Sequence, residues 1–401
     1  MPASTAPRLL DGEVRDALER ARGLPIDELI ELIERSGLRG RGGAGYPFAD
    51  KVRAVRANLD GGPVCLVANG YDADPGSPLA RTLLTKNASS VINGIAIAAH
   101  LVNATRAYLY LHPEAVDARA AAEHGITERA DTNGVPIEIA LGPGGFMGGE
   151  ESALLNVLEA RRAMARQRPP YPAAQGLQMR PTLVASVETL SWLPLIVAEQ
   201  VRASTKLVSV TGAVQRPGVY EVTLGTSLGE ILGEAGGAKG KLKGLHVGGP
   251  TGGILAASRT DTRFDFDDLR VAGTHMGSAH VRAIPAGTCI VNEAAALFAY
   301  LARESCAICV PCRVGTKRVQ GILESAYSGL GRDSDLAWLD ELGTHMERFS
   351  LCGFGITAPS ILRTTMREFA DDYRVHIQER RCPEDVCKPV RSRRYETMVQ
   401  P

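Results

Sequence analysis

The run PVCLVANG, residues 63–70, is apolar almost from end to end, and the polar turn YDADPG, residues 71–76, follows it directly. A short continuous apolar run is typical of a strand buried on both faces of a parallel sheet. Ligands bind in α/β sheets at the carboxyl ends of such strands, so we expect a site here. Asp72 and Asp74 would then bond ribose or amide groups, although Asp-Pro-Gly is also ordinary turn chemistry.

Helix and strand patterns alternate around this strand and predict an α/β layered domain over residues 1–200. The expected helices cover 9–35, 88–104, 116–124 and 151–159, and the expected further strands cover 106–111 and 137–141. Two short strands, a turn at Arg216-Pro217-Gly218 and a short helix then predict a small α+β domain over 201–287. Four amphipathic segments over 288–375 predict a four-helix bundle, followed by a basic tail over 376–401.

Charge and cysteine content exclude several classes of protein. The 401 residues carry 45 Lys+Arg and 45 Asp+Glu, a balance that favours neither nucleic acid nor an anionic membrane surface as partner. The start lacks an apolar leader, and the longest apolar stretch, residues 91–111, is interrupted by polar side chains, which predicts no membrane span. We therefore expect a cytoplasmic protein, attached to a membrane at most through partner subunits. In a reducing compartment its eight cysteines favour metal binding over disulfides.

Four of these cysteines have the spacing of a cluster site. Cys306, Cys309 and Cys312 stand within CAICVPC, residues 306–312, and Cys352 lies beyond two predicted helices. Three thiolates in one loop cover one face of a [4Fe-4S] cubane, and a distant fourth completes the set. A structural zinc site is the alternative, since zinc also binds four cysteines.

Two glycine-rich loops add candidate ligand sites. GLRGRGGAG, residues 37–45, offers backbone amides and two arginines to a phosphate, unless it is simply a flexible loop. It fits neither the dinucleotide fingerprint nor the Walker A loop. The second loop, residues 142–149, leads directly into Glu150 and Glu151.

Together these stretches resemble the flavin-carrying, NADH-oxidising subunit family of respiratory complex I, which has relatives in NAD-linked hydrogenases and formate dehydrogenases. The resemblance runs from about residue 30 to 375. It is carried by SGLRGRGGAGYP (36–47), NGYDADPG (69–76), GPGGFMGGEESALLNVLE (142–159), RPPYPAAQGL (168–177), VASVETL (184–190), ESCAICVPCRVGT (304–316) and SLCGFG (350–355).

The resemblance implies a Rossmann-like FMN domain over 1–200, a ubiquitin-like β-grasp domain of the soluble-ligand-binding type over 201–287 and a helical [4Fe-4S] domain over 288–375. It also implies that NADH passes a hydride to FMN, and that single electrons then go to the cluster and on to a partner subunit. A [2Fe-2S] thioredoxin-like subunit is the expected partner. The acidic loops favour NADH over NADPH, because they would repel a 2′-phosphate.

The resemblance also implies residue roles, with Asp72 and Glu150 as catalytic residues and Tyr46 stacking on the adenine. The implied FMN- and NADH-binding residues are Gly40, Arg41, Gly42, Gly43, Tyr46, Lys51, Asn69, Asp72, Asp74, Phe146, Glu150, Glu151 and Ser186.

Several positions depart from the family pattern. Tyr71 replaces the first acid of the acidic loop, and Asp72 and Asp74 replace glutamates. Phe146 stands for a tyrosine, and Ala185 and Ser186 stand for two asparagines. These changes keep two alternatives open beside the NADH-oxidising enzyme. One is a non-catalytic iron-sulfur relay or assembly subunit without FMN, and the other is a zinc-stabilised interaction module.

A second metal site is expected near the end of the chain. HIQERRCPEDVC contains His376, Cys382 and Cys387, and with Cys289 they would form a mixed tetrad that suits zinc. The alternative is a tail with free thiols. The remaining cysteine, Cys65, lies in the predicted buried strand and is expected to be a small core residue.

Overall fold

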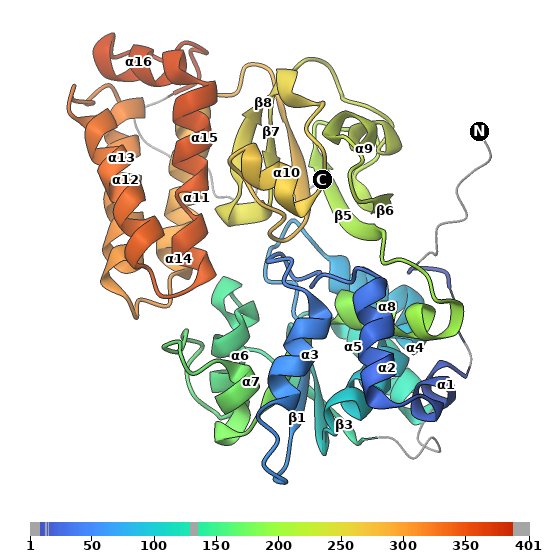
Figure 1. Cartoon of the computed structure of the whole chain (residues 1–401). Coiled ribbons are helices and arrows are strands. Elements are labelled where there is room, and N and C mark those ends of the chain that lie inside the picture. Colours follow the sequence, from blue (N-terminus) through green and yellow to red (C-terminus); the bar gives the residue numbers. More distant parts are fainter. Residues whose placement is uncertain (1–8, 13, 15, 129–134, 388–401) are drawn as a thin grey trace. The chain divides into compact units, whose positions relative to one another are not determined.

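The computed structural model describes residues 9–12, 14, 16–128 and 135–387, and the chain divides into two compact units (Figure 1). The first unit comprises the chain up to Ala73, Pro78–Leu207 and Glu221–Thr223. The second comprises Asp74–Ser77, Val208–Tyr220 and the chain from Leu224 onward. This confirms a mixed α/β protein with a helical C-terminal part.

The first unit is built on a four-stranded parallel sheet with strand order β3-β2-β1-β4. Its strands are β1 (Cys65–Gly70), β2 (Arg106–Leu111), β3 (Ile137–Leu141) and β4 (Thr182–Ser186). From β1 the chain proceeds through β2 to β3 on one side, and then returns to place β4 on the other side of β1. The strand order therefore reverses between β1 and β4, where open α/β sheets form their ligand crevice.

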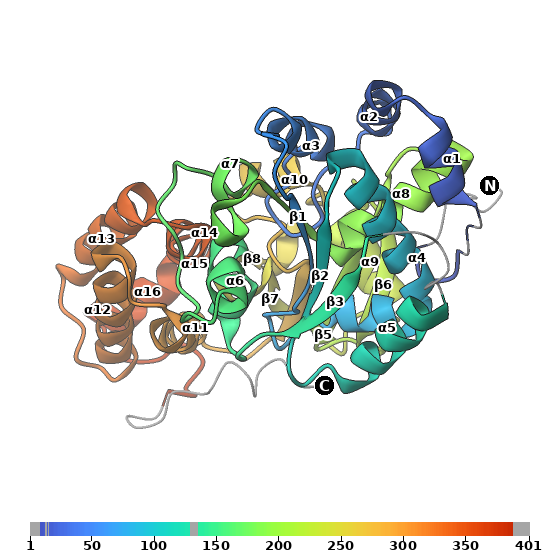
Figure 2. The ribbon, with the colours of Figure 1, turned by 90° about the horizontal axis from the view of Figure 1, so that it is seen from below.

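Helices cover both faces of this sheet. Figure 2 shows α4, α5 and α8 on one face and α6 and α7 on the other. The helices are α1 (Ala17–Gly23), α2 (Ile26–Arg35), α3 (Phe48–Arg56), α4 (Leu79–Val102), α5 (Val116–Glu128), α6 (Glu151–Leu158), α7 (Pro172–Gln175) and α8 (Val187–Glu199), with 3-10 turns η1 (Phe146–Gly149) and η2 (Leu177–Met179).

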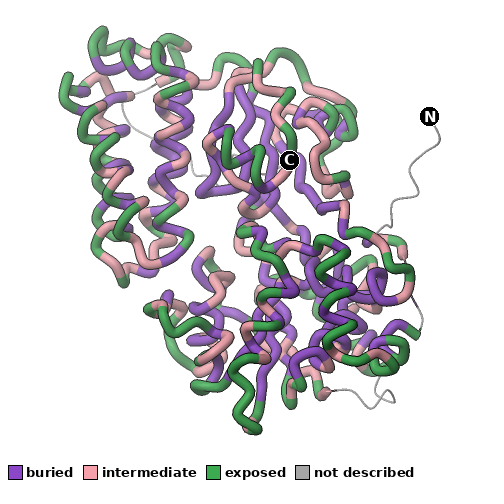
Figure 3. The backbone as a smooth tube through the Cα atoms, viewed as in Figure 1, coloured by how far each residue is buried: buried purple, intermediate pink, exposed green. Residues whose placement is uncertain are grey.

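The central strand β1 is buried on both faces, as its apolar run predicts. Cys65 and Val67 pack in a core cluster with Leu154 and Leu155 of α6. Because side chains alternate along a strand, Leu66 points to the opposite face, which α4 and α8 cover. In Figure 3 the buried residues accordingly follow the strands.

The second unit contains a five-stranded mixed sheet with strand order β6-β5-β9-β7-β8. Strands β5 and β9 are parallel, and β7 runs antiparallel to both β8 and β9. The strands are β5 (Thr205–Gly212), β6 (Gly218–Thr223), β7 (Leu242–Val247), β8 (Gly253–Ala256) and β9 (His280–Pro285), accompanied by α9 (Leu228–Glu234), α10 (Phe266–Val271), η3 (Gly249–Thr251) and η4 (Ala257–Arg259).

The same unit ends in a group of helices. They are α11 (Ile290–Glu304), α12 (Val310–Tyr327), α13 (Asp335–Phe349), α14 (Gly353–Thr357), α15 (Ser360–Glu368) and α16 (Ala370–Gln378). All four predicted helical segments are helices, but the fourth is broken at Phe369 into α15 and α16, and the short α14 was not predicted. The helical segments and the five-stranded sheet belong to one compact unit, so the division at residue 287 stays a prediction.

Among the described residues, no helix is both long enough and apolar enough to cross a membrane.

Candidate functional site

Three segments that the sequence singles out separately meet where the strand order reverses. Asn69 and Ser186 are register partners at the carboxyl ends of β1 and β4. The first glycine loop approaches Ser186, because a β-carbon on Gly42 would lie 3.7 Å from the Ser186 β-carbon. The second glycine loop approaches Asn69, whose Nδ2 donates a hydrogen bond to the Gly149 carbonyl at 3.0 Å. The topology thus gathers the predicted binding loops at one edge of the sheet.

The first glycine loop is pinned rather than free. The Gly40 amide donates to the Tyr46 carbonyl at 2.8 Å and closes the loop. The buried Arg41 anchors it further, since its amide donates to Thr189 Oγ1 at 2.8 Å and its guanidinium to the Ala203 carbonyl at 2.7 Å. Gly42 is exposed at the tip, and Gly43 has a φ of 109°, which favours glycine. The geometry therefore presents loop backbone to a ligand, and a direct phosphate contact by Arg41 stays a prediction.

Two basic side chains hold the adjacent carboxylates. Glu150 accepts hydrogen bonds from the amides of Ser152 and Ala153, both at 2.9 Å, and so caps the N-terminus of α6. Arg168 donates to Glu150 at 2.6 Å and lies 3.5 Å from a Glu151 oxygen. Lys51 forms an ion pair with Glu151. The predicted binding residues Lys51, Glu150 and Glu151 thus join Arg168 in one partly exposed ionic network.

The two aspartates of the acidic loop, residues 71–76, form hydrogen bonds in different units. Asp72 caps α4 by accepting hydrogen bonds from the amides of Ala80 at 2.8 Å and Arg81 at 2.7 Å, with a φ of 45°. Asp74 belongs to the second unit and is buried, with Ser278 Oγ at 2.6 Å and His280 Nδ1 at 3.2 Å from the same carboxylate oxygen. Cofactor-binding roles for both aspartates stay predictions, and their contacts here stabilise the fold.

Aromatic residues of the site differ in exposure. Tyr71, in place of the family's acid, is buried and stacks on Tyr110 with ring centroids 5.2 Å apart. A β-carbon on Gly148 would lie 2.4 Å from the Tyr71 hydroxyl, so the Tyr71 ring packs directly against the backbone of the second glycine loop. Tyr46 is 56% exposed, which leaves its ring available to a ligand. Phe146 begins η1 and is half-buried.

The predicted cluster ligands occupy helix starts in the second unit. Cys309 is the N-cap of α12, Cys312 lies in its first turn, and Cys352 is the N-cap of α14. Cys306 lies in the loop before α12. Burial raises the pKa of the Cys312 thiol to about 11, a rise to which the neighbouring Cys309 and Cys306 add, although Ser305 Oγ, 3.4 Å from its sulfur, opposes it. The Cys306 and Cys309 thiols therefore lie near enough to Cys312 to affect its pKa.

A glycine brings the fourth cysteine to the other three. A β-carbon on Gly355 in α14 would lie 2.9 Å from the Cys312 β-carbon and 2.5 Å from Ser350 Oγ. Only glycine therefore lets α14 lie this close to α12. Since Cys352 starts α14, this contact brings the start of α14 near the first turn of α12, and four cysteine thiolates are a donor set that suits a [4Fe-4S] cluster.

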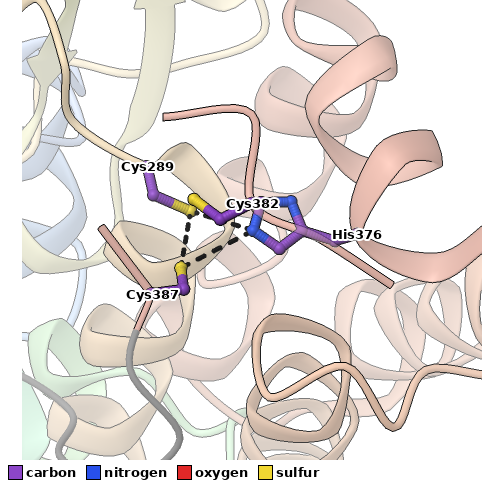
Figure 4. Close-up of side chains that lie close together, drawn as sticks. All are labelled: Cys289, His376, Cys382 and Cys387. Carbon is purple, nitrogen blue, oxygen red and sulfur yellow. Dashed lines mark hydrogen bonds between the residues drawn. The ribbon is translucent and has the colours of Figure 1, made fainter. Parts of the chain in front are cut away.

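The other predicted metal ligands also meet. Figure 4 shows Cys289, His376, Cys382 and Cys387 around one point, with their ligand atoms within 4.8 Å of one another. None of the eight cysteines forms a disulfide, and Cys65 is a buried core residue in β1.

Sequence reasoning missed two residues that organise the first site. Arg168 binds both carboxylates, and its only signal was its position before Pro169-Pro170. Thr189 accepts the Arg41 amide and lies 2.8 Å from Ser186 Oγ, so it links the glycine loop to the end of β4. Its signal was its place three residues after Ser186, the capping distance of a helix start.

Comparison with known proteins assigns all three parts of the chain. Residues 33–194 match the Nuo51 FMN-binding domain, residues 207–255 the SLBB domain, and residues 292–376 the NADH-ubiquinone oxidoreductase-F iron-sulfur binding region. The F 2 subunit of the NADH-quinone oxidoreductase of Rhizobium meliloti is 34% identical over 92% of this chain and 93% of its own length. The HndC subunit of the NADP-reducing hydrogenase of Solidesulfovibrio fructosivorans is 33% identical over 90% of this chain and 78% of its own length.

A solved structure supports the same relationship. An NAD+-reducing [NiFe]-hydrogenase in its H2-reduced state contains a similar chain, with a TM-score of 0.83 and 33% identity. The match covers 92% of this chain and 66% of that chain.

Proposed function

The chain belongs to the F-subunit family of NADH-quinone oxidoreductases, and we propose that it is the electron-input subunit of a redox complex, taking electrons from NADH. One observation carries the proposal beyond family membership: the Asn69–Ser186 pair, both glycine loops and the Lys51–Glu151 pair gather at the strand-order reversal of a parallel sheet. FMN held there would supply the chemistry that takes a hydride from NADH and passes single electrons on toward the [4Fe-4S] cluster.

The residues of the chain bind and orient. The exposed backbone at Gly42 and Gly43 suits a phosphate, which accepts hydrogen bonds from loop amides. Lys51 supplies the positive charge on the same side, and Asn69 and Ser186 offer polar atoms at the strand ends. Tyr46 presents its ring for adenine to stack on.

The acidic side of the site supports NADH over NADPH. Glu150 and Glu151 lie together, and a ribose 2′-hydroxyl can donate a hydrogen bond to a carboxylate, whereas a 2′-phosphate cannot replace that hydrogen bond. Asp72 adds negative charge from the neighbouring loop.

Cys306, Cys309, Cys312 and Cys352 are the proposed ligands of the [4Fe-4S] cluster, in line with the matched iron-sulfur region over residues 292–376. α12 begins at Val310, so the partial positive charge of its N-terminus lies beside the negatively charged cluster site.

The finer fold and the partner belong to the same proposal. In chain order the strands of the second sheet read 2-1-5-3-4, with the first and last parallel at the centre, which supports a ubiquitin-like β-grasp. The parallel first sheet supports a Rossmann-like FMN domain, and α11, α12, α13 and α15 support a four-helix cluster domain. The named relatives are subunits, so a [2Fe-2S] thioredoxin-like subunit remains the expected partner.

The test is anaerobic purification of the full chain followed by acid release and quantification of flavin. We expect about one FMN per chain, about four irons and bleaching of the flavin absorption on addition of NADH. A Lys51→Ala variant should weaken FMN binding about tenfold, because it removes a charged hydrogen bond worth about 1.5 kcal/mol. The exposed Lys86 provides the matched control, and Lys86→Ala should bind FMN normally.

The relay without FMN is the second candidate, and one observation favours it. The ring of Tyr71 takes the place of an acid and is buried against Tyr110, so this position offers no charged group to a cofactor. If the purified protein contains its full complement of iron but takes up no flavin when FMN is supplied, the relay function would replace the proposed NADH-oxidising function.

A further inference from the structure

The four ligand atoms near the end of the second unit have the spacing of a tetrahedral metal site. Cys289 Sγ lies 3.3 Å from Cys387 Sγ and 3.3 Å from His376 Nε2, and Cys387 Sγ lies 3.6 Å from the same nitrogen (Figure 4). In tetrahedral zinc, with Zn–S bonds of about 2.3 Å and a Zn–N bond of about 2.1 Å, ligand atoms stand about 3.5–3.8 Å apart. These three distances need to change by only a few tenths of an ångström, and Cys382 Sγ, within 4.8 Å of the other three atoms, needs to move by about 1 Å at most.

The histidine is oriented as a metal ligand. His376 Nδ1 lies 2.6 Å from the Asp372 carbonyl, an acceptor, so Nδ1 carries the proton and donates it. The lone pair of Nε2 is then free to point at the thiols. Histidines that bind metal are typically fixed by such a hydrogen bond from their other nitrogen to a carbonyl.

The segment that supplies two of the sulfurs is held by no regular secondary structure. After α16 ends at Gln378, residues 379–387 form neither helix nor strand and are mostly exposed. The apolar Val386 is 46% exposed, yet Cys382 and Cys387 turn inward to the buried Cys289 and His376. The ion pair between Lys243 and Glu384, at 2.7 Å, is partly exposed and contributes at most about 1 kcal/mol.

We propose that Cys289, His376, Cys382 and Cys387 bind one structural Zn²⁺. Four protein ligands fill a tetrahedral zinc and leave no position for substrate, so the ion has a structural role. It ties residues 379–387 to the start of α11, because Cys289 is the N-cap of that helix. A two-iron cluster would spread its ligands over two metals, whereas all four ligand atoms here lie within 4.8 Å of one another.

Zinc-edge X-ray absorption of the untagged full chain, purified with its other cofactors, tests the proposal directly. We expect one zinc per chain, with three sulfurs at about 2.3 Å and one nitrogen at about 2.0–2.1 Å. Protein that contains no zinc after growth in zinc-supplemented medium would overturn the proposal. So would a zinc bound only by nitrogen and oxygen, two irons beyond those of the [4Fe-4S] cluster, or a Cys289–Cys387 disulfide detected by mass.

Variants then assign the ligands. After dialysis against a chelator, Cys387→Ser should lose at least nine-tenths of its zinc and keep the iron content of the unaltered protein. Cys65→Ala is the matched control, because Cys65 is a buried thiol in the other unit and should leave both metals unchanged. Full zinc retention in Cys387→Ser would refute the assignment. If that variant fails to fold, the absorption spectrum of the unaltered protein still decides.

Discussion

A close helix contact in the proposed cluster site predicts a sharp effect of one methyl group. In Gly355→Ala, the new β-carbon would lie 2.5 Å from Ser350 Oγ and 2.9 Å from the Cys312 β-carbon. Uncrowded non-bonded contacts need about 3.5–4.0 Å, so α14 must move away by about 1 Å. Such overpacking costs about 1–3 kcal/mol, and the helix propensity of alanine returns about 0.5–1 kcal/mol.

The displacement should be felt by the cluster more than by the fold. Cys352 starts α14 and moves with it, whereas metal sites tolerate distance errors of about 0.2 Å. We therefore expect the iron content of Gly355→Ala to fall to roughly half or less, with faster bleaching of the cluster absorption in air. Iron and sulfide analysis and visible absorption during exposure to air provide the measurement.

Gly321→Ala is the matched control, since Gly321 is an exposed glycine of α12 with no atom within 4 Å of the place that a β-carbon would take. It keeps the propensity gain without the steric conflict, and its iron content should equal that of the unaltered protein. Equal iron content and equal stability in the two variants would refute the argument that Gly355 sets the approach of α14.

Three further outcomes follow from buried polar contacts. Lys206→Met should lower the free energy of unfolding by about 3–5 kcal/mol in chemical denaturation, because it leaves the buried Glu188, 2.5 Å from Lys206 Nζ, without its partner. Adding Glu188→Leu should restore most of the loss. A loss below about 1 kcal/mol in the single variant would contradict this expectation. Burial works against ionisation of Asp74, but His280, Ser278 and the Gly76 amide outweigh it and hold the pKa of that carboxyl below its usual range. The contribution of the ionised Asp74 to the free energy of unfolding is therefore full above about pH 4 and is lost as the pH falls through the folded-state pKa. The unfolding free energy of Asp74→Asn should thus differ from that of the unaltered protein more at pH 5 than at pH 3, and a difference that is constant with pH would show that the charge is irrelevant. Thr189→Val should weaken FMN binding about tenfold in a fluorescence titration, because it leaves the buried Arg41 amide without its hydrogen-bond acceptor, at a cost of about 1–3 kcal/mol. Unchanged binding would show that this hydrogen bond does not shape the glycine loop.

The sequence predicted the strands whose signal is local. Strands β2 and β3 have the predicted bounds, because each is a short run that a proline-containing turn ends, at His112-Pro113 and at Gly142-Pro143. Strand β4 and helix α8 were missed, since Ser186 is both the last residue of the strand and the N-cap of the helix and no turn separates them. Pro194 inside α8 further disguises the helix. Strands β7, β8 and β9 were missed because they depend on pairing with distant segments.

The candidate site shows the same division between local and distant information. Asn69 lies near the end of β1, one residue before Gly70, as the predicted strand indicates, because the end of a buried strand can be read locally; its binding role stays a prediction. Asp72 and Asp74 are two residues apart, yet one caps α4 in the first unit and the other is buried beside His280 in the second. Which neighbours a loop residue meets is decided by segments about 200 positions away, and no local pattern encodes that.

The two cysteine-rich sites lie at opposite ends of α11, and this limits how they can influence each other. Cys289 caps the first turn of this 15-residue helix, and Ser305 at its other end directly precedes Cys306. At 1.5 Å per residue the helix separates the sites by about 22 Å, where two unit charges interact by about 0.2 kcal/mol at the dielectric constant of water and about 0.8 kcal/mol at an effective value of 20. The charge of a zinc ion should therefore shift the reduction potential of the cluster only slightly, whereas its removal should free one end of α11 and lower thermal stability. A nearly unchanged potential together with a lower unfolding temperature in Cys387→Ser would show a mechanical link, and a strongly shifted potential would show that the sites are coupled electrostatically.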